Sequence, residues 1–116
     1  MANIADRILG WLLLIGGVLH GLGSVSSYDF GSPILVWALA GSLAAMLLAA
    51  LNLMRVNRPA DRTIAWVSFA GCLGWIALAA AFGSTLGNPF DPRVLYHVVV
   101  TLGLAAFSLR GATRTP

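Results

Sequence analysis

Charged residues are scarce in this sequence. Only 9% of its 116 residues are charged, and they comprise seven arginines and four aspartates, with no lysine and no glutamate. A soluble domain carries about 25% charged residues, and a small one must cover most of its surface with polar groups. The composition therefore excludes an ordinary small soluble domain, and the 59% of hydrophobic residues indicates that lipid is the main solvent.

Other absences narrow the classes of function. The single cysteine, Cys72, excludes an internal disulfide and a cysteine-based zinc site. No basic face or run is present to follow phosphates, so no nucleic-acid partner is expected. The chain has no Ser-His-Asp set at one depth, no glycine-rich phosphate loop and no metal-hydrolase motif. We therefore expect no metal site and no catalytic residues, which favours a protein that is not an enzyme.

Four long apolar runs are present, at residues 8–25, 33–54, 63–82 and 92–109. Each has roughly the 20 residues that a helix needs to cross a hydrocarbon core of about 30 Å. The runs lack the two-residue alternation of membrane strands. We predict an all-α integral membrane protein in which residues 1–116 form one four-helix up-down transmembrane bundle.

The helix starts support this prediction independently of hydropathy. A side chain able to cap a helix stands at or before the start of each run: Asn3, Ser32, Asp61 and Asp91. Pro33 and Pro92 follow two of these caps at the first helical position, which favours proline. Asp6 falls in the expected first turn of the first helix, where the helix dipole favours a carboxylate.

The arginines are distributed unevenly between the two ends of the predicted helices. Arg93 falls at one end, and the other six fall at the opposite end: Arg7, Arg55, Arg58, Arg62, Arg110 and Arg114. Positive residues concentrate on the cytoplasmic side of membrane proteins. We therefore predict a multi-pass protein of the cell inner membrane with both termini in the cytoplasm.

The two halves of the chain resemble each other. Residues 7–55 and 62–110 align without gaps. The matched identities include Arg7 with Arg62, Trp11 with Trp66, Gly16 with Gly71 and Arg55 with Arg110. The alignment is consistent with a tandem repeat of two helical hairpins, related by an axis along the membrane normal. The alternative is that two membrane hairpins share the same constraints.

Pairs of small residues four positions apart occur in three of the helices. They are Gly17 with Gly21, Gly41 with Ala45, Ala45 with Ala49, Ala70 with Gly74, and Ala77 with Ala81. Such pairs let membrane helices approach closely. They either pack the bundle internally or join it to partners in a homo-oligomer or a larger membrane complex within the lipid bilayer.

Titratable groups are almost absent from the four apolar runs, which contain no Asp, Glu or Lys. This argues against proton-coupled transport, because such transport usually requires a buried carboxylate. The remaining candidates are His20, about 20 Å along its helix from Arg7, and His97, about 7 Å along its helix from Pro92. Both histidines are therefore expected at similar depth, in the half of the membrane away from the termini.

Two interpretations of this histidine pair differ in chemistry. In the first, His20 and His97 are the axial ligands of a b-type haem, or line a quinone pocket with Trp75, Tyr96 and Thr101. In the second, each histidine simply bonds a backbone carbonyl or hydroxyl inside the bundle.

Other polar side chains are expected to serve packing. Asn52, near the end of its helix, either bonds across helices or serves as glue or snorkels at the membrane interface. The hydroxyls of Ser42, Ser68, Thr101 and Ser108 are expected to bond carbonyls of their own helices. The sequence therefore predicts a non-catalytic bundle or accessory subunit that acts through helix contacts. The alternatives are a haem- or quinone-binding electron-transfer subunit and an oligomeric small-molecule carrier or channel. An enzyme that acts on lipids is a weaker alternative, because no nucleophile and base can be named together.

Overall fold

Four α-helices make up almost the whole chain. The computed structural model describes residues 2–115, and no strand occurs among them. The helices are α1 (Ala2–Ser27), α2 (Pro33–Asn57), α3 (Arg62–Thr85) and α4 (Pro92–Thr113). All four are long and apolar enough to span a membrane. The prediction of an all-α protein with four such helices is therefore confirmed.

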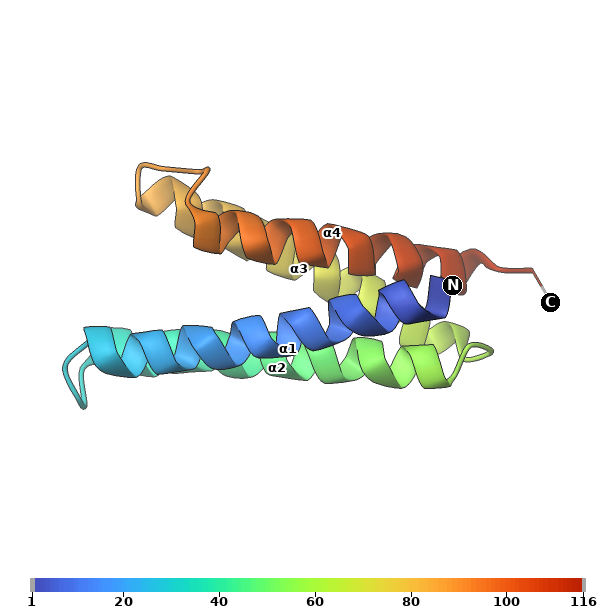
Figure 1. Cartoon of the computed structure of the whole chain (residues 1–116), viewed down its shortest axis with the longest axis horizontal. Helices are drawn as coiled ribbons and strands as arrows, with labels where there is room; N and C mark the ends of the chain where they lie inside the picture. The colour runs from blue at the N-terminus through green and yellow to red at the C-terminus, as the bar shows by residue number, and fades with distance from the viewer. Residues whose placement is uncertain (1, 116) are drawn as a thin grey trace.

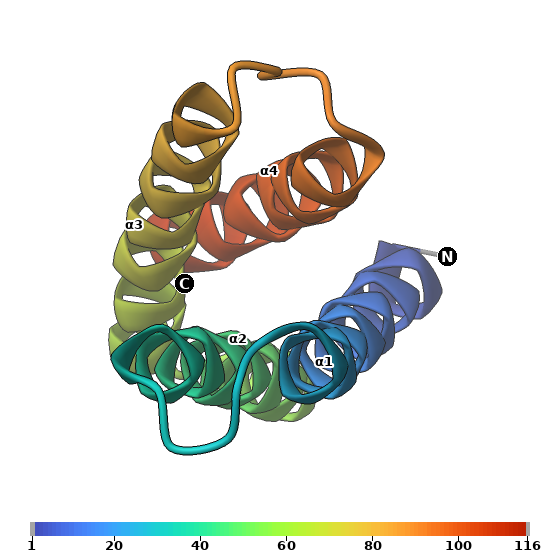
Figure 2. The ribbon, with the colours of Figure 1, turned by 90° about the vertical axis from the view of Figure 1, so that its left-hand side faces the viewer.

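The helices pair into two hairpins. Most contacts between helices lie within the α1–α2 and α3–α4 hairpins, and fewer join α1 to α4 and α2 to α3. The α2–α3 loop and both chain ends lie at one end of the elongated molecule, here called the termini end (Figure 1). The other two loops lie at the opposite end, where the ribbons of α1 and α4 stand well apart (Figures 1 and 2).

Three of the four predicted helix caps are confirmed. Ser32 Oγ accepts a hydrogen bond from the Leu35 amide, and Asp61 Oδ1 accepts one from the Ile64 amide. Asp91 Oδ1 accepts one from the Arg93 amide.

The predictions for the start of α1 are wrong. The helix already includes Ala2, so Asn3 is a helical residue and cannot be the cap, and Asp6 lies beyond the first turn. The error arose because the apolar run begins later than the helix does. Asp6 is nevertheless helical, and its side chain is buried.

Close contacts between helices rely on glycine. A Cβ atom at Gly17 would lie 2.9 Å from Met46 Cγ, and one at Gly103 would lie 2.6 Å from Leu9 Cδ1. Both distances are too short for a side chain without rearrangement. The core behind these contacts is small: Leu13, Ala45, Leu48, Ala49, Cys72, Val100, Leu104 and Ala105. Many large apolar side chains instead point outward, as expected where lipid is the solvent.

The small-residue pairs divide into two groups. Those of α1 and α2 lie inside the first hairpin, where Gly21 faces Ser42 and Gly17 faces Ala45. Those of α3 lie on the outer surface, where four positions on one helix face are exposed: Ala70, Gly74, Ala77 and Ala81. A Cβ atom at Gly74 would have nothing within 4 Å. We call these four residues the α3 small face.

Candidate functional site

A buried ion pair joins α1 to α2 near the termini end. Arg55 Nη2 donates to Asp6 Oδ1 at 2.7 Å, and Arg55 Nη1 donates to Asp6 Oδ2 at 2.8 Å. Asp6 is only 5% exposed and Arg55 only 6%. A guanidinium and a carboxylate in this two-bond geometry satisfy much of each other's hydrogen-bonding need, which is what allows both charges to leave water.

Asn52 extends this pair to the other two helices. Its Oδ1 accepts from Ser108 Oγ on α4 at 3.1 Å and from Arg55 Nη2 at 3.1 Å. Its Nδ2 donates to the Leu48 carbonyl at 3.0 Å and to Cys72 Sγ on α3 at 3.6 Å. Asp6, Asn52, Arg55, Cys72 and Ser108 form what we call the buried polar cluster. Each of the four helices contributes at least one of its side chains.

This cluster revises the expectation that the bundle holds no buried carboxylate. The expectation rested on the apolar runs, and Asp6 stands two residues before the first of them begins at Ile8. Of the roles considered for Asn52, bonding across helices is the one that the structure shows, because Asn52 is buried and accepts a hydrogen bond from Ser108 of α4.

The prediction that these four hydroxyls bond carbonyls of their own helices is wrong. Ser42 Oγ donates to the Gly17 carbonyl of α1 at 2.6 Å, and Ser108 Oγ donates to Asn52, so both bond across helices. Ser68 Oγ and Thr101 Oγ1 are buried, and neither has a hydrogen-bond partner among residues 2–115. These hydrogen bonds depend on the distances between neighbouring helices. Such distances cannot be inferred from the spacing of residues in the sequence.

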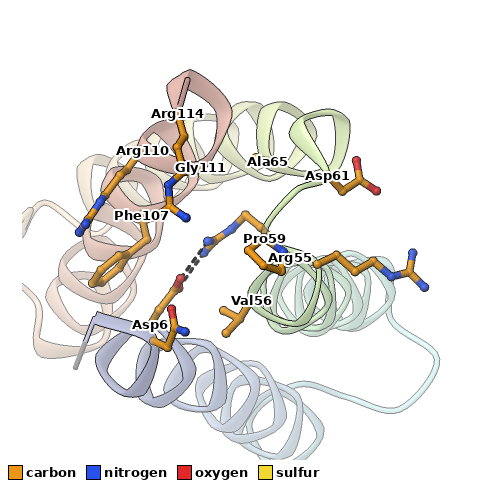
Figure 3. Close-up of a pocket in the computed structure, with 12 residues that line it drawn as sticks. Asp6, Arg55, Val56, Pro59, Asp61, Ala65, Phe107, Arg110, Gly111 and Arg114 are labelled. Atoms are coloured by element: carbon orange, nitrogen blue, oxygen red, sulfur yellow. Dashed lines mark hydrogen bonds and ion pairs between the residues drawn. The ribbon is translucent and has the colours of Figure 1, made fainter. Parts of the chain in front are cut away.

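A cavity of about 50 Å³ opens beside the ion pair at the termini end (Figure 3). Asp6 and Arg55 lie on one side of it, and the Arg114 side chain extends toward it from the end of α4 (Figure 3). Phe107 and Val56 supply apolar parts of the wall. The cavity is large enough for a few water molecules, and its lining carries more arginines than aspartates.

A second cluster of side chains surrounds His97, in the half of the bundle farther from the termini end. Trp75 Nε1 of α3 donates to His97 Nδ1 at 3.2 Å, and the two rings meet edge to face at 5.6 Å. Tyr96 Oη donates to the Leu12 carbonyl of α1 at 2.6 Å. The rings of Tyr96 and His97 both lie against Gly16, where a Cβ atom would be 2.7 Å from Tyr96 Cε1 and 3.2 Å from His97 Cε1. We call these residues the His97 cluster.

His20 faces a different neighbour. Its Nε2 lies near Gly41 of α2, 3.7 Å from the position that a Cβ atom would take there. The structure therefore places His20 in the α1–α2 interface and His97 where α1, α3 and α4 meet. Of the proposed ligand-pocket residues, Trp75 and Tyr96 both contact His97.

The Trp75 hydrogen bond has a consequence for ligand binding by His97. Indole nitrogen only donates, so His97 Nδ1 must present its lone pair, and a neutral ring then carries its proton on Nε2. A histidine that binds iron through Nε2 usually donates from Nδ1 instead. The observed geometry therefore favours a packing role for His97, with an indole as the partner in place of the expected carbonyl or hydroxyl.

Comparison with protein-family models, curated proteins and solved structures finds no match to this chain.

Proposed function

We propose that the protein is a non-catalytic membrane bundle, or an accessory subunit, that acts through contacts between helices. The observation that carries the proposal is the α3 small face. The glycines of α1 contact other helices or lie near its ends, whereas Ala70, Gly74, Ala77 and Ala81 line one exposed side of α3. Larger exposed side chains, Leu73 and Leu78 among them, flank this face. A second membrane helix fits such a surface, because close backbone approach is what drives helix association in lipid.

The proposed setting is the cell inner membrane, with an up-down arrangement and both termini in the cytoplasm. Support comes from the six arginines at the termini end against Arg93 at the other. We also propose that the two hairpins are a tandem repeat. Extended by one residue beyond its start at Arg7 and Arg62, the alignment that matches Arg55 with Arg110 also pairs Asp6 with Asp61. All four of these residues line the same cavity.

The test is a matched pair of substitutions. Gly74→Leu places a large side chain in the middle of the α3 small face, whereas Gly23→Leu places one at another exposed glycine with nothing within 4 Å of its Cβ position. We expect Gly74→Leu to weaken association in native membranes, measured by cross-linking and by co-purified partners, with the fold intact. Gly23→Leu should leave it unchanged. Equal association in the wild type and both variants would refute the proposal.

The oligomeric carrier or channel is a second candidate, favoured by one observation. Asp6 is a buried carboxylate, the kind of group that proton-coupled carriers use. Proton flux into liposomes that is lost in Asp6→Asn and retained in Asp91→Asn would favour this candidate. Absence of flux in the wild type would remove it.

A further inference from the structure

Two hollows adjoin each other at the termini end. The first is the cavity of about 50 Å³ beside the Asp6–Arg55 pair. The second measures about 380 Å³ and is lined by Pro59, Ala60, Arg62, Gly111, Arg114 and Thr115. Arg114 borders both hollows. The larger one falls in the size range of small-molecule sites, about 300–1,000 Å³.

Most of the positive charge around these hollows has no acidic partner. Among residues 2–115, Arg55 pairs with Asp6, whereas Arg58, Arg110 and Arg114 form no ion pair and are exposed. Arg62 Nε donates to the Ala112 carbonyl at 3.0 Å, which ties the start of α3 to the end of α4. Guanidinium groups bind phosphate oxygens through paired N–H donors. The charge of the hollows therefore suits a phosphate group.

The walls and the depth of the site suit a lipid. Apolar side chains of Val56, Ala65 and Phe107 line the first cavity beneath the arginines. The 25 residues of α2 extend about 37 Å, which exceeds the hydrocarbon core of about 30 Å. Arg58, directly after α2, thus reaches the headgroup region. So does Arg114 at the end of α4, whose 22 residues extend about 33 Å. Exposed Trp11 and Trp66, each about one turn from an arginine at this end, are the residues expected at a membrane interface.

From this charge, lining and depth, we infer that the two hollows around Arg114 bind the headgroup of an anionic phospholipid from the leaflet at the termini end. Arg114, whose side chain extends toward the first cavity, contacts the phosphate (Figure 3). Arg110 lines the same cavity, but its guanidinium group points away from it in Figure 3 and turns toward the phosphate on binding. The apolar wall at Phe107 contacts the glycerol region. Basic pockets between membrane helices are a known means of binding anionic headgroups.

The experiment compares two variants that lose the same charge at the same end of the molecule. Arg114→Gln removes an arginine between the hollows. Arg7→Gln removes one outside them, whose Nη2 donates to Asn57 Oδ1 at 2.6 Å. Native mass spectrometry of detergent-purified protein, titrated with phosphatidylglycerol or phosphatidylcholine, measures the bound lipid. We expect Arg114→Gln to weaken phosphatidylglycerol binding about fivefold, and the Arg110→Gln/Arg114→Gln pair about thirtyfold, because each basic residue contributes roughly fivefold near an anionic surface.

The control variant, Arg7→Gln, should change phosphatidylglycerol binding by less than twofold. Phosphatidylcholine should bind weakly to the wild type and to every variant. An equal loss in Arg7→Gln and Arg114→Gln would show diffuse attraction without a site, and would overturn the inference. Equal binding of the two lipids by the wild type would also overturn it. Inorganic phosphate at millimolar concentration should not displace phosphatidylglycerol, and complete displacement would assign the site to free phosphate.

Discussion

The carboxylate of Asp6 and the guanidinium of Arg55 form two hydrogen bonds, 2.7 and 2.8 Å long, inside the bundle although 49 positions separate them in the chain. Removing one partner of a buried pair leaves an uncompensated charge and costs about 3–5 kcal/mol. We expect Asp6→Leu to destabilise the protein by this amount, measured by unfolding in detergent. The Asp6→Leu/Arg55→Met double variant should recover most of the loss. If the double variant is no more stable than Asp6→Leu, the loss does not come from the unpaired charge of Arg55, and the prediction is wrong.

Asn52 is the second point at which the buried polar cluster can be broken. Asn52→Leu removes the acceptor of Ser108 Oγ and one acceptor of Arg55. A buried donor left without its partner costs about 1–3 kcal/mol, so we expect a loss of this order in unfolding free energy. Ser84→Ala is the control, because that exposed hydroxyl bonds only the Ala80 carbonyl of its own helix. A loss as small as that of the control would contradict the assigned role of Asn52.

Two glycines of α1 should respond with opposite signs to the same substitution. Gly16→Ala places a methyl group 2.7 Å from Tyr96 Cε1, and the Tyr96 ring cannot move easily because its hydroxyl is bonded to Leu12. Overpacking of this kind costs about 1–3 kcal/mol. Gly23→Ala meets nothing within 4 Å and should stabilise the helix by up to about 1 kcal/mol. Thermal unfolding of the two variants in one detergent checks the difference in sign.

The His97 tautomer is set by Trp75. With Trp75 Nε1 donating to Nδ1, ¹⁵N NMR of the neutral ring should show the proton on Nε2. Trp75→Phe should release this preference and cost about 1 kcal/mol of stability. The control is Trp66→Phe, whose partner is the ring of Phe69 and not a histidine. A wild-type ring protonated on Nδ1, or a haem absorption band from the purified protein, would contradict this assignment.

The ionisation of Asp91, at the end of the molecule opposite the termini end, should make stability depend on pH. Hydrogen bonds from the Arg93 side chain, then from the Arg93 backbone amide, lower the pKa of Asp91 from 3.8 to about 2. Because the folded pKa is depressed, the contribution to stability is complete above about pH 4 and disappears as the pH falls toward 2. Carboxyl NMR titration should show the Asp91 pKa rising toward 3.8 in Arg93→Gln. The distant Arg110→Gln variant should leave it unchanged.

The parts of the structure that depend on local sequence could be predicted, and the others could not. Ser32, Asp61 and Asp91 cap helices through amides two or three residues away, so sequence spacing is enough to identify them. The Asp6–Arg55 pair depends on where α1 begins and on how it is rotated against α2. Likewise, Ser108 reaches Asn52 only because the two hairpins pack at one particular depth. The sequence predicts Trp75 as a pocket residue, but the bond from Trp75 to His97 depends on that same packing.

The two parts of the buried polar cluster become complete at different times as the chain is made. Asp6 and Arg55 both belong to the first hairpin, so their charges can neutralise each other as soon as α2 has followed α1 into the membrane. The partners that Asn52 finds in α3 and α4, Cys72 and Ser108, emerge from the ribosome later. The first hairpin can therefore insert with this ion pair formed, while the Asn52 amide, already bonded to Leu48 and Arg55 within α2, keeps bonding capacity for α3 and α4. That amide then provides a docking point for the second hairpin and helps to set its depth.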